Sequence, residues 1–304
     1  MRKLRTFAGL ALAAALVCQA GAARAQRDQM LVSAAWLAQH LGDKDLVIWH
    51  VGDQAAYTAG HLPGARFVTL QQISATPSGP MPLSLEMAPA DQLRTTLAAL
   101  GVSNSSHVVV YQPKDSVQSA TRALFTLLYA GLDRVSLLDG GMGAWTAEGH
   151  PLTTDVPAPT AGSLAPFTPK PLVVDAAFVQ AHVNAPGFVV VDARDAAYFD
   201  GTSIGGPTDH RVAGHIAGAR SVPFSQVITA DWHLKAAAEL EALFSKAGVK
   251  PTDTVVAYCH IGQQATATLF AARSLGHPVL LYDGSFEDWA RRGLPIENPA
   301  KKDK

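Results

Sequence analysis

The chain has 304 residues, of which 48% are hydrophobic and 16% are charged. This balance excludes a disordered chain, and the length predicts two domains of ordinary size. The formal net charge is −1, and removal of residues 1–25 would leave 20 basic against 25 acidic residues. A mildly acidic protein has no electrostatic attraction to nucleic acid or to an anionic membrane surface, so neither is expected as a partner.

Residues 1–25 have the three parts of a secretory signal peptide. Three basic residues lie in the first five positions, an apolar run covers residues 7–17, and Ala-Arg-Ala at 23–25 has the small-x-small pattern of a cleavage site. The run is shorter than the about 20 residues that a membrane span needs. We therefore expect cleavage after Ala25 and export to the periplasm, with no stable membrane span. An uncleaved N-terminal anchor is the alternative, and lipidation at Cys18 is less favoured.

Cleavage after residue 25 would leave Cys259 as the only cysteine. Exported proteins often contain disulfides, but a chain with one cysteine cannot form one internally. Cys259 is therefore either a small buried hydrophobic residue or a free reactive thiol. The residues around it have to distinguish these two interpretations.

The rest of the chain contains one set of motifs twice, in the same order. The first half has LVIWHV (46–51), GHLPGA (60–65), a helical pattern (91–100), VVVY (108–111) and VSLLDGGMGAWTAEG (135–149). The second half has FVVVDA (188–193), GHIAGA (214–219), helical patterns (235–244 and 266–276), VVAY (255–258) and VLLYDGSFEDWARRG (279–293). This order indicates a duplicated domain rather than a short-period repeat.

The alternation of strands and helices predicts the fold class. Continuous apolar runs are typical of strands buried on both faces, and strands that alternate with helices predict an α/β parallel sheet with helices on both faces. Residues 151–171 are rich in Pro, Thr, Ala and Ser and predict a linker. We therefore predict an N-terminal domain over 26–150 and a C-terminal domain over 172–304.

The segment VVAYCHIGQQATATLF places Cys259 between a strand and a helix. Ligands of open α/β sheets bind at the carboxyl ends of the strands. The first main-chain amides of a helix have no partner inside it, so they can bind an anion such as a thiolate. Gly262 allows the loop to turn tightly around the sulfur. This context favours the reactive thiol over the buried bystander.

Together these motifs resemble a tandem-domain rhodanese, a sulfurtransferase of the thiosulfate and 3-mercaptopyruvate type. The resemblance covers nearly all of the chain after residue 25 and rests on VVDARDAAYFDG (190–201), GHIAGARSVPF (214–224), VVAYCHIGQQA (255–265) and LYDGSFEDW (281–289). In this family the N-terminal domain has lost the cysteine. Here Gln112 follows VVVY where Cys259 follows VVAY.

The resemblance implies covalent catalysis by Cys259. Its thiolate would take the outer sulfur of a donor such as thiosulfate, and the resulting persulfide would pass the sulfur to cyanide or a thiol. The loop amides would stabilise the negative charge, and they belong to His260, Ile261, Gly262, Gln263 and Gln264. The expected partners are small sulfur donors and acceptors, with a thiol protein as a further kind of acceptor. A monomer is expected, and no cofactor or metal is required.

The loop departs from the family's specificity patterns. Thiosulfate-type enzymes have Arg and Lys directly after the cysteine, and mercaptopyruvate-type enzymes have Ser two residues after it, whereas this chain has His260 and Ile261. Tyr198 stands where a second Arg is often found. The donor therefore stays open. His260 either binds the anion as a cation or is a solvated loop residue. Gln263 and Gln264 either donate to an anion or form an ordinary polar loop edge.

Four further residues are candidates for the site. Asp192 and Arg194 follow a buried strand, and a pair that supports the active-site loop is favoured over direct substrate contact by Arg194, because buried charges need partners. His215 and His61 lie in the two GHxxGA motifs and are favoured as structural turn residues. His61 facing the site across the domain interface is the alternative.

Two other functions compete with sulfur transfer. A phosphatase-like enzyme of a related fold would have Arg six residues after the cysteine, but Ala265 is there, so the phosphate would lack its guanidinium clamp. A non-catalytic persulfide carrier or binding module stays open, because the loop is nearly uncharged. The histidines lack the spacing of metal ligands, and no Gly-rich phosphate loop is present.

Overall fold

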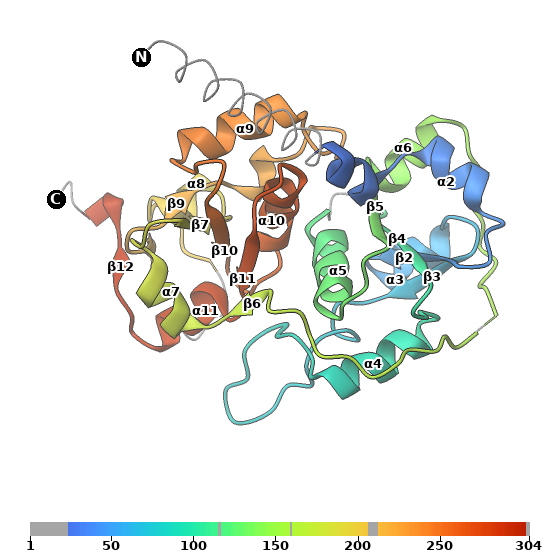
Figure 1. Cartoon of the computed structure of the whole chain (residues 1–304), viewed down its shortest axis with the longest axis horizontal. Coiled ribbons are helices and arrows are strands. Elements are labelled where there is room, and N and C mark those ends of the chain that lie inside the picture. Colours follow the sequence, from blue (N-terminus) through green and yellow to red (C-terminus); the bar gives the residue numbers. More distant parts are fainter. Residues whose placement is uncertain (1–23, 115–116, 159, 206–211, 302–304) are drawn as a thin grey trace, which may run out of the picture.

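The computed structural model describes residues 24–114, 117–158, 160–205 and 212–301. Most of the expected signal peptide therefore lies outside the described residues. The described chain forms two α/β units that follow one another in sequence (Figure 1). No helix in these described ranges is long and apolar enough to cross a bilayer.

Each unit is built on a five-stranded parallel sheet. The N-terminal sheet has the order β1-β5-β4-β2-β3 and consists of β1 (Leu31–Val32), β2 (Leu46–Val51), β3 (Ala65–Val68), β4 (His107–Tyr111) and β5 (Val135–Leu138). The C-terminal sheet has the order β6-β11-β10-β7-β9 and consists of β6 (Val173–Val174), β7 (Phe188–Asp192), β9 (Arg220–Ser221), β10 (Thr254–Tyr258) and β11 (Val279–Tyr282). The orders are the same when the strands are matched in sequence, which confirms the duplication and the predicted fold class. A short antiparallel pair, β8 (His215–Ile216) and β12 (Ile296–Glu297), completes the second unit.

The helices alternate with these strands. Those of the first unit are α2 (Ala34–His40), α3 (Gln54–Ala59), α4 (Ala90–Ala99), α5 (Val117–Tyr129) and α6 (Gly141–Ala147). Those of the second are α7 (Ala176–His182), α8 (Ala196–Phe199), η1 (Phe224–Gln226), α9 (Ala237–Lys246), α10 (Ala265–Ser274), α11 (Ser285–Arg291) and η2 (Pro299–Lys301). The three helical patterns of the sequence correspond to α4, α9 and α10. Gly276, with φ of +90°, follows the end of α10, where glycine commonly ends a helix.

The buried apolar residues explain why helices cover both faces of each sheet. On the outer faces, α2 and α6 pack on the first sheet, and α7 and α11 pack on the second. Trp145 and Trp289 are the largest side chains of these two outer cores, and each donates its indole N–H to a proline carbonyl. On the inner faces, α4, α5, α9 and α10 share one core that joins both units.

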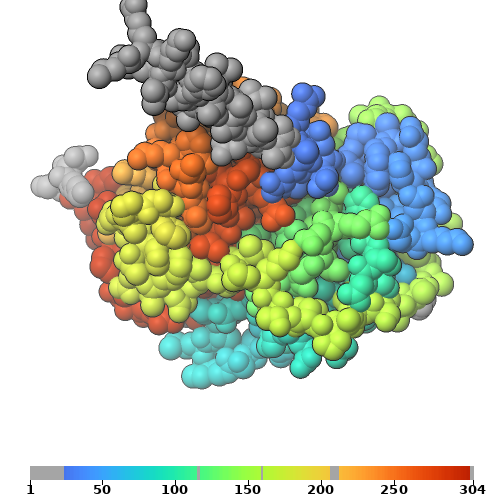
Figure 2. All heavy atoms as spheres, viewed as in Figure 1, coloured from blue at the N-terminus to red at the C-terminus, as the bar shows by residue number. Residues whose placement is uncertain are grey.

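The two units therefore meet through α5 and α10, which lie next to each other between the sheets (Figure 1). A segment around residues 75–89, which precedes α4, extends beneath the C-terminal unit (Figure 2). Its main chain bonds to that unit: the amides of Ser84 and Met87 donate to Glu287 and Asp283. This arrangement brings N-terminal residues to the carboxyl ends of the C-terminal strands.

Candidate active site

Cys259 directly follows β10, the central strand of the C-terminal sheet. Its thiol is free, and its side chain is 0% exposed. Its amide donates to Ser285 Oγ at 3.2 Å, and that hydroxyl donates to the Tyr282 carbonyl at 2.9 Å. Ser285 has φ of +53°, which is strained for a residue other than glycine. The strand end and the turn before α11 therefore hold the cysteine from both sides.

The loop from Cys259 to Gln264 is held through its carbonyl groups. The Phe286 and Glu287 amides in the first turn of α11 donate to the carbonyls of Cys259 and His260, at 3.0 and 3.1 Å. Gly262 has φ of +76°, so the chain turns there in a conformation that only glycine adopts freely. After this turn the Gln263 carbonyl accepts from Thr266 as α10 begins.

The amides of the same loop are free to bind a ligand. Among the described residues, the main-chain N–H groups of 260–264 donate to no acceptor. Buried amides are normally paired, so a run of free ones at a helix start is typical of an anion site. The loop thus presents a run of unpartnered amides directly after Cys259.

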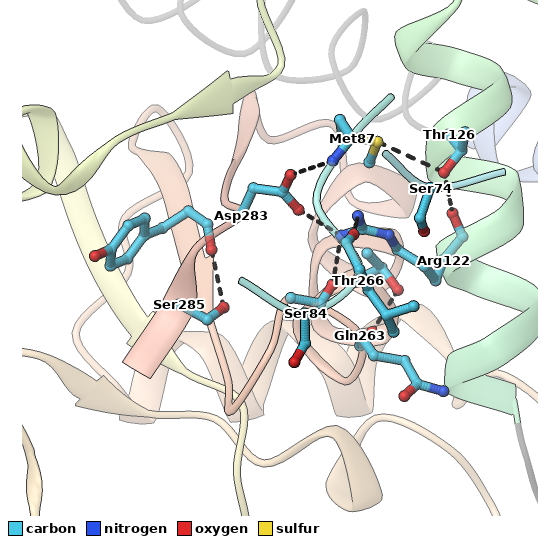
Figure 3. A network of polar contacts seen from close by, with 12 residues as sticks. Ser74, Ser84, Met87, Arg122, Thr126, Gln263, Thr266, Asp283 and Ser285 are labelled. Atoms are coloured by element: carbon cyan, nitrogen blue, oxygen red, sulfur yellow. Dashed lines mark hydrogen bonds and ion pairs between the residues drawn. The ribbon is translucent and has the colours of Figure 1, made fainter. Parts of the chain in front are cut away.

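Arg122, which sequence reasoning missed, reaches the loop from the N-terminal unit (Figure 3). It lies on α5, is 1% exposed, and donates through Nη1 to the Gly262 carbonyl at 2.9 Å and to Asp283 Oδ1 at 2.7 Å. Its Nη2 donates to the Leu85 carbonyl. The Asp283 carboxylate also accepts from the Met87 amide at 2.6 Å. The signal in the sequence was a single cation in a helix whose other residues are uncharged.

A cleft of about 650 Å³ lies beside the loop, between the two units. Ile261 and Gln263 line it from the C-terminal unit, and the remaining lining comes from the N-terminal one: Val51, Gly52, Asp53, Thr69, Leu70, Gln71, Ser84, Leu85 and Ser119. The side-chain amide of Gln263 donates through Nε2 to Ser119 Oγ at 2.8 Å, so this side chain bridges the two units. Gln264 instead has a buried side-chain oxygen without a partner.

Asp192 and Arg194 form a buried ion pair next to the loop. The Arg194 guanidinium makes three hydrogen bonds to the Asp192 carboxylate through Nε and Nη2, at 2.6 to 3.1 Å, and one to the Gly214 carbonyl. Tyr258 donates to Asp192 at 2.8 Å, and Arg194 stacks on Phe286 at 4.0 Å. Burial by itself lowers the pKa of Arg194, but the charge and hydrogen bonds of Asp192 raise it above its usual value. These contacts pair both charges and leave Arg194 1% exposed, so direct substrate contact by its guanidinium is not favoured.

His260 is packed rather than solvated. Its ring meets the Tyr198 ring edge to face, with centroids 4.8 Å apart, and its Nδ1 is buried without a partner. Burial, and then the charge of Arg194, lower the pKa of His260 to about 4. The ring is therefore neutral at neutral pH. Neither the cationic ligand nor the solvated residue considered from the sequence matches these surroundings.

The two GHxxGA histidines have equivalent structural contacts. His215 bonds through Nδ1 to the Phe199 carbonyl at 2.7 Å and stacks on the Phe199 ring. His61 bonds through Nδ1 to the Tyr57 carbonyl at 2.8 Å, stacks on that ring, and contacts the Asp155 carbonyl through Nε2. These contacts fit turn residues. Within the described ranges, no group of three or more His, Cys, Asp or Glu residues is placed to hold a metal ion.

A family model and several curated proteins match this chain over most of its length. A family model described as the rhodanese-like domain matches residues 33–148 and again residues 175–292. The 3-mercaptopyruvate sulfurtransferase of Escherichia coli is 31% identical over 280 residues, which are 88% of this chain and 97% of that protein. The sulfur carrier protein TtuD of Thermus thermophilus is 30% identical over 280 residues (88% and 96%). The thiosulfate sulfurtransferase of Gallus gallus is 32% identical over 237 residues (77% and 80%).

Proposed function

The chain belongs to the rhodanese-like family of sulfurtransferases, and from this we propose that it transfers a sulfane sulfur through a persulfide on Cys259. The donor is a small molecule such as thiosulfate, and the acceptor is a thiophile such as cyanide or a thiol. The observation that carries the proposal is the run of unpartnered amides at 260–264, which directly follows the free thiol. No cofactor is required by this chemistry.

Two displacements make up the proposed cycle. In the first, the Cys259 thiolate attacks the outer sulfur of thiosulfate, a sulfur–sulfur bond forms, and sulfite leaves with the electron pair of the broken bond. In the second, cyanide attacks the terminal sulfur of the persulfide, and thiocyanate leaves as the Cys259 thiolate is restored. A negative charge stays in the loop throughout, where fixed amide dipoles stabilise it without reorganising.

The surroundings of the thiol support a small donor. Cys259 is 0% exposed, and the neighbouring cleft reaches the loop at Ile261 and Gln263. The nearly uncharged loop leaves the choice between thiosulfate and mercaptopyruvate to experiment, so both are tested.

Steady-state sulfur transfer to cyanide tests this proposal. We expect thiocyanate formation by the full chain, its complete loss in Cys259→Ser, and its retention in Cys18→Ser, which removes the other cysteine. Absence of turnover with thiosulfate, mercaptopyruvate and low-molecular-weight persulfides would refute the proposal that the chain is a sulfurtransferase for small donors.

A partner-specific sulfur carrier is the second candidate. The buried thiol and the similarity to a protein named as a sulfur carrier support it. This candidate predicts that Cys259 gains a sulfur but releases it to a thiol protein and not to cyanide. The two candidates therefore separate at the acceptor step.

We also propose that residues 1–25 direct export and that the mature protein is a periplasmic monomer. The basic start, the apolar run and the Ala-Arg-Ala site support the first part. Fractionation of expressing cells with N-terminal sequencing should give a periplasmic protein that begins at Gln26. A full-length chain in the cytoplasm would contradict this. Analytical ultracentrifugation of the processed protein tests whether it is a monomer.

A further inference from the structure

Arg122 is a buried cation in a helix whose other buried residues are mostly apolar. Burying a charge is costly unless it is paired and hydrogen-bonded. Two of the three groups that accept from Arg122 belong to the C-terminal unit: the Gly262 carbonyl and the Asp283 carboxylate (Figure 3). The third is the Leu85 carbonyl of its own unit. The cation is therefore arranged to connect the N-terminal unit to the loop that follows Cys259.

The contact with Gly262 has a directional consequence. In a planar trans peptide the C=O and the following N–H point in opposite directions. Arg122 holds the Gly262 carbonyl on one side, so it turns the Gln263 N–H to the other side of the same peptide. That N–H is one of the loop amides with no acceptor among the described residues.

Other peptides of the loop are held by a different element. The first-turn amides of α11 fix the carbonyls of Cys259 and His260, which orients the N–H groups of His260 and Ile261. The Gly262–Gln263 peptide lies beyond the reach of these amides and depends on Arg122. The carbonyls of Cys259 and His260 are therefore held from the C-terminal unit, and the carbonyl of Gly262 is held from the N-terminal unit.

The support from Arg122 is one-sided, although the interface is nearly symmetric. Thr121 on α5 and Thr266 on α10 meet through their hydroxyls at 2.9 Å, as equivalent positions on two facing helices. The residue after Thr121 is Arg122, whereas the residue after Thr266 is Ala267. At this pair of equivalent positions, the unit that contains the cysteine receives a guanidinium from its neighbour and the other unit does not.

We infer that Arg122 is a positioning residue for sulfur transfer, acting across the domain interface by aiming the Gln263 amide at the sulfur anion. Asp283 keeps the guanidinium in place through its bond to Nη1. The inference rests on the proposed persulfide function. It adds that the N-terminal unit, which has no cysteine of its own at the corresponding position, completes the anion site of the other unit.

Rates of persulfide formation on Cys259 test this inference. We expect Arg122→Met to lower kcat/KM for the donor by about 10- to 100-fold, since removing one preorganised donor costs about 100- to 1,000-fold and here the donor is only misdirected. The kcat/KM of Arg122→Lys should lie between those of the wild type and Arg122→Met, because one ammonium cannot reproduce the planar guanidinium. If Arg122→Met leaves Asp283 unpaired and does not fold, Arg122→Met/Asp283→Asn removes both charges and takes its place.

The matched control is Asp139→Asn in the other unit. Asp139 accepts from the Leu234 amide at 2.8 Å, as Asp283 accepts from the Met87 amide, so this change loosens the interface without touching the loop. We expect activity within twofold of the wild type. An equal loss of activity in Asp139→Asn and Arg122→Met would reduce Arg122 to an interface residue and overturn the inference, as would full activity in folded Arg122→Met.

Amide NMR spectra give a readout that a purely structural role would not move. On persulfide formation we expect the resonances of His260, Ile261 and Gln263 to shift in the wild type. In Arg122→Lys the Gln263 shift should shrink, while those of His260 and Ile261 persist because α11 still holds their peptides. Equal persistence of all three would overturn the inference. A wild type that forms no persulfide would instead refute the proposed function, so the two failures are distinguishable.

Discussion

The two units of the molecule place the same turn beside the end of the central strand and fill it differently. In the C-terminal unit, Cys259 ends the strand and Ser285, with φ of +53°, donates and accepts hydrogen bonds next to it. In the N-terminal unit, Gln112 ends the strand and Gly141 has φ of +57°. A Cβ added at Gly141 would lie 2.7 Å from the Gln112 carbonyl oxygen. The N-terminal unit has the same backbone turn, without a thiol at position 112 or a hydroxyl at position 141.

The two units also differ in the contacts of the tyrosine that ends the central strand. Tyr258 donates to the Asp192 carboxylate, which pairs with Arg194. The corresponding Tyr111 instead contacts the neutral ring of His50 at 2.9 Å, and Gly52 stands in the place of the arginine. Burial is the first cause that lowers the pKa of His50, to about 4. The ion pair below β10 in the C-terminal unit is therefore replaced by a neutral contact in the N-terminal unit.

The backbone contacts between the two units are symmetric at two equivalent turns. Leu85 and Trp232 both have positive φ, and two residues after each of them an amide donates to the Asp of the other unit's Asp-Gly motif. The backbone contacts are thus reciprocal, and Arg122 is not. The two units therefore share their backbone frame and differ in the side chains around the strand end.

Exchange of the strand-end residues should have the largest effect. Cys259→Ser should reduce sulfur transfer to background. Gln112→Cys should not create a second site, because Gly141 offers no hydroxyl and Ala267 no guanidinium there. Peptide mapping after donor treatment measures this. A persulfide on residue 112 would show that the surrounding groups are dispensable.

Removal of the buried ion pair should have the next largest effect, on stability. Asp192→Asn leaves Arg194 buried without its counter-ion and should lower the free energy of unfolding by about 3–5 kcal/mol. His50→Asn in the other unit alters one neutral hydrogen bond and should cost about 1 kcal/mol. Urea denaturation of both variants compares them. Equal costs would contradict the distinction between the two units.

Changes at the strained turn should have moderate effects. Ser285→Ala loses the bond to the Cys259 amide and should cost about 1–2 kcal/mol with lower activity. Gly141→Ala forces a methyl group against Gln112 and should cost about 1–3 kcal/mol without lowering sulfur transfer by folded protein. Thermal unfolding and turnover, measured in parallel, separate the two. Reduced turnover in Gly141→Ala would link the inactive copy to the reaction.

The buried histidines should have the smallest effect at neutral pH. The folded chain protonates His260 and His50 only near pH 4, whereas the unfolded chain does so near pH 6.5. Their contribution to stability is therefore complete above pH 6.5 and is lost as the pH falls toward 4. His260→Gln should flatten this decline and leave the pH profile of activity between 6.5 and 8 unchanged. A changed profile would assign the ring a proton-transfer role.

The sequence was sufficient for the fold class, the duplication and the position of Cys259, because these follow from apolar periodicity and local motifs. It was not sufficient for Arg122, whose partners Gly262 and Asp283 lie 140 and 161 residues further along the chain. Periodicity assigns a residue to a helix but not to a partner on another domain. The strain at Ser285 was hidden for a similar reason, since nothing in the motif distinguishes its φ from that of an ordinary helix start.

The central claim is that sulfur is carried by Cys259 and by no other residue. The most direct measurement is the mass of the peptide that contains Cys259, after treatment of the protein with thiosulfate and again after cyanide. The account predicts one additional sulfur on that peptide, its disappearance with cyanide, and release of an equal amount of thiocyanate. Thiocyanate formation without any sulfur on Cys259 would contradict it.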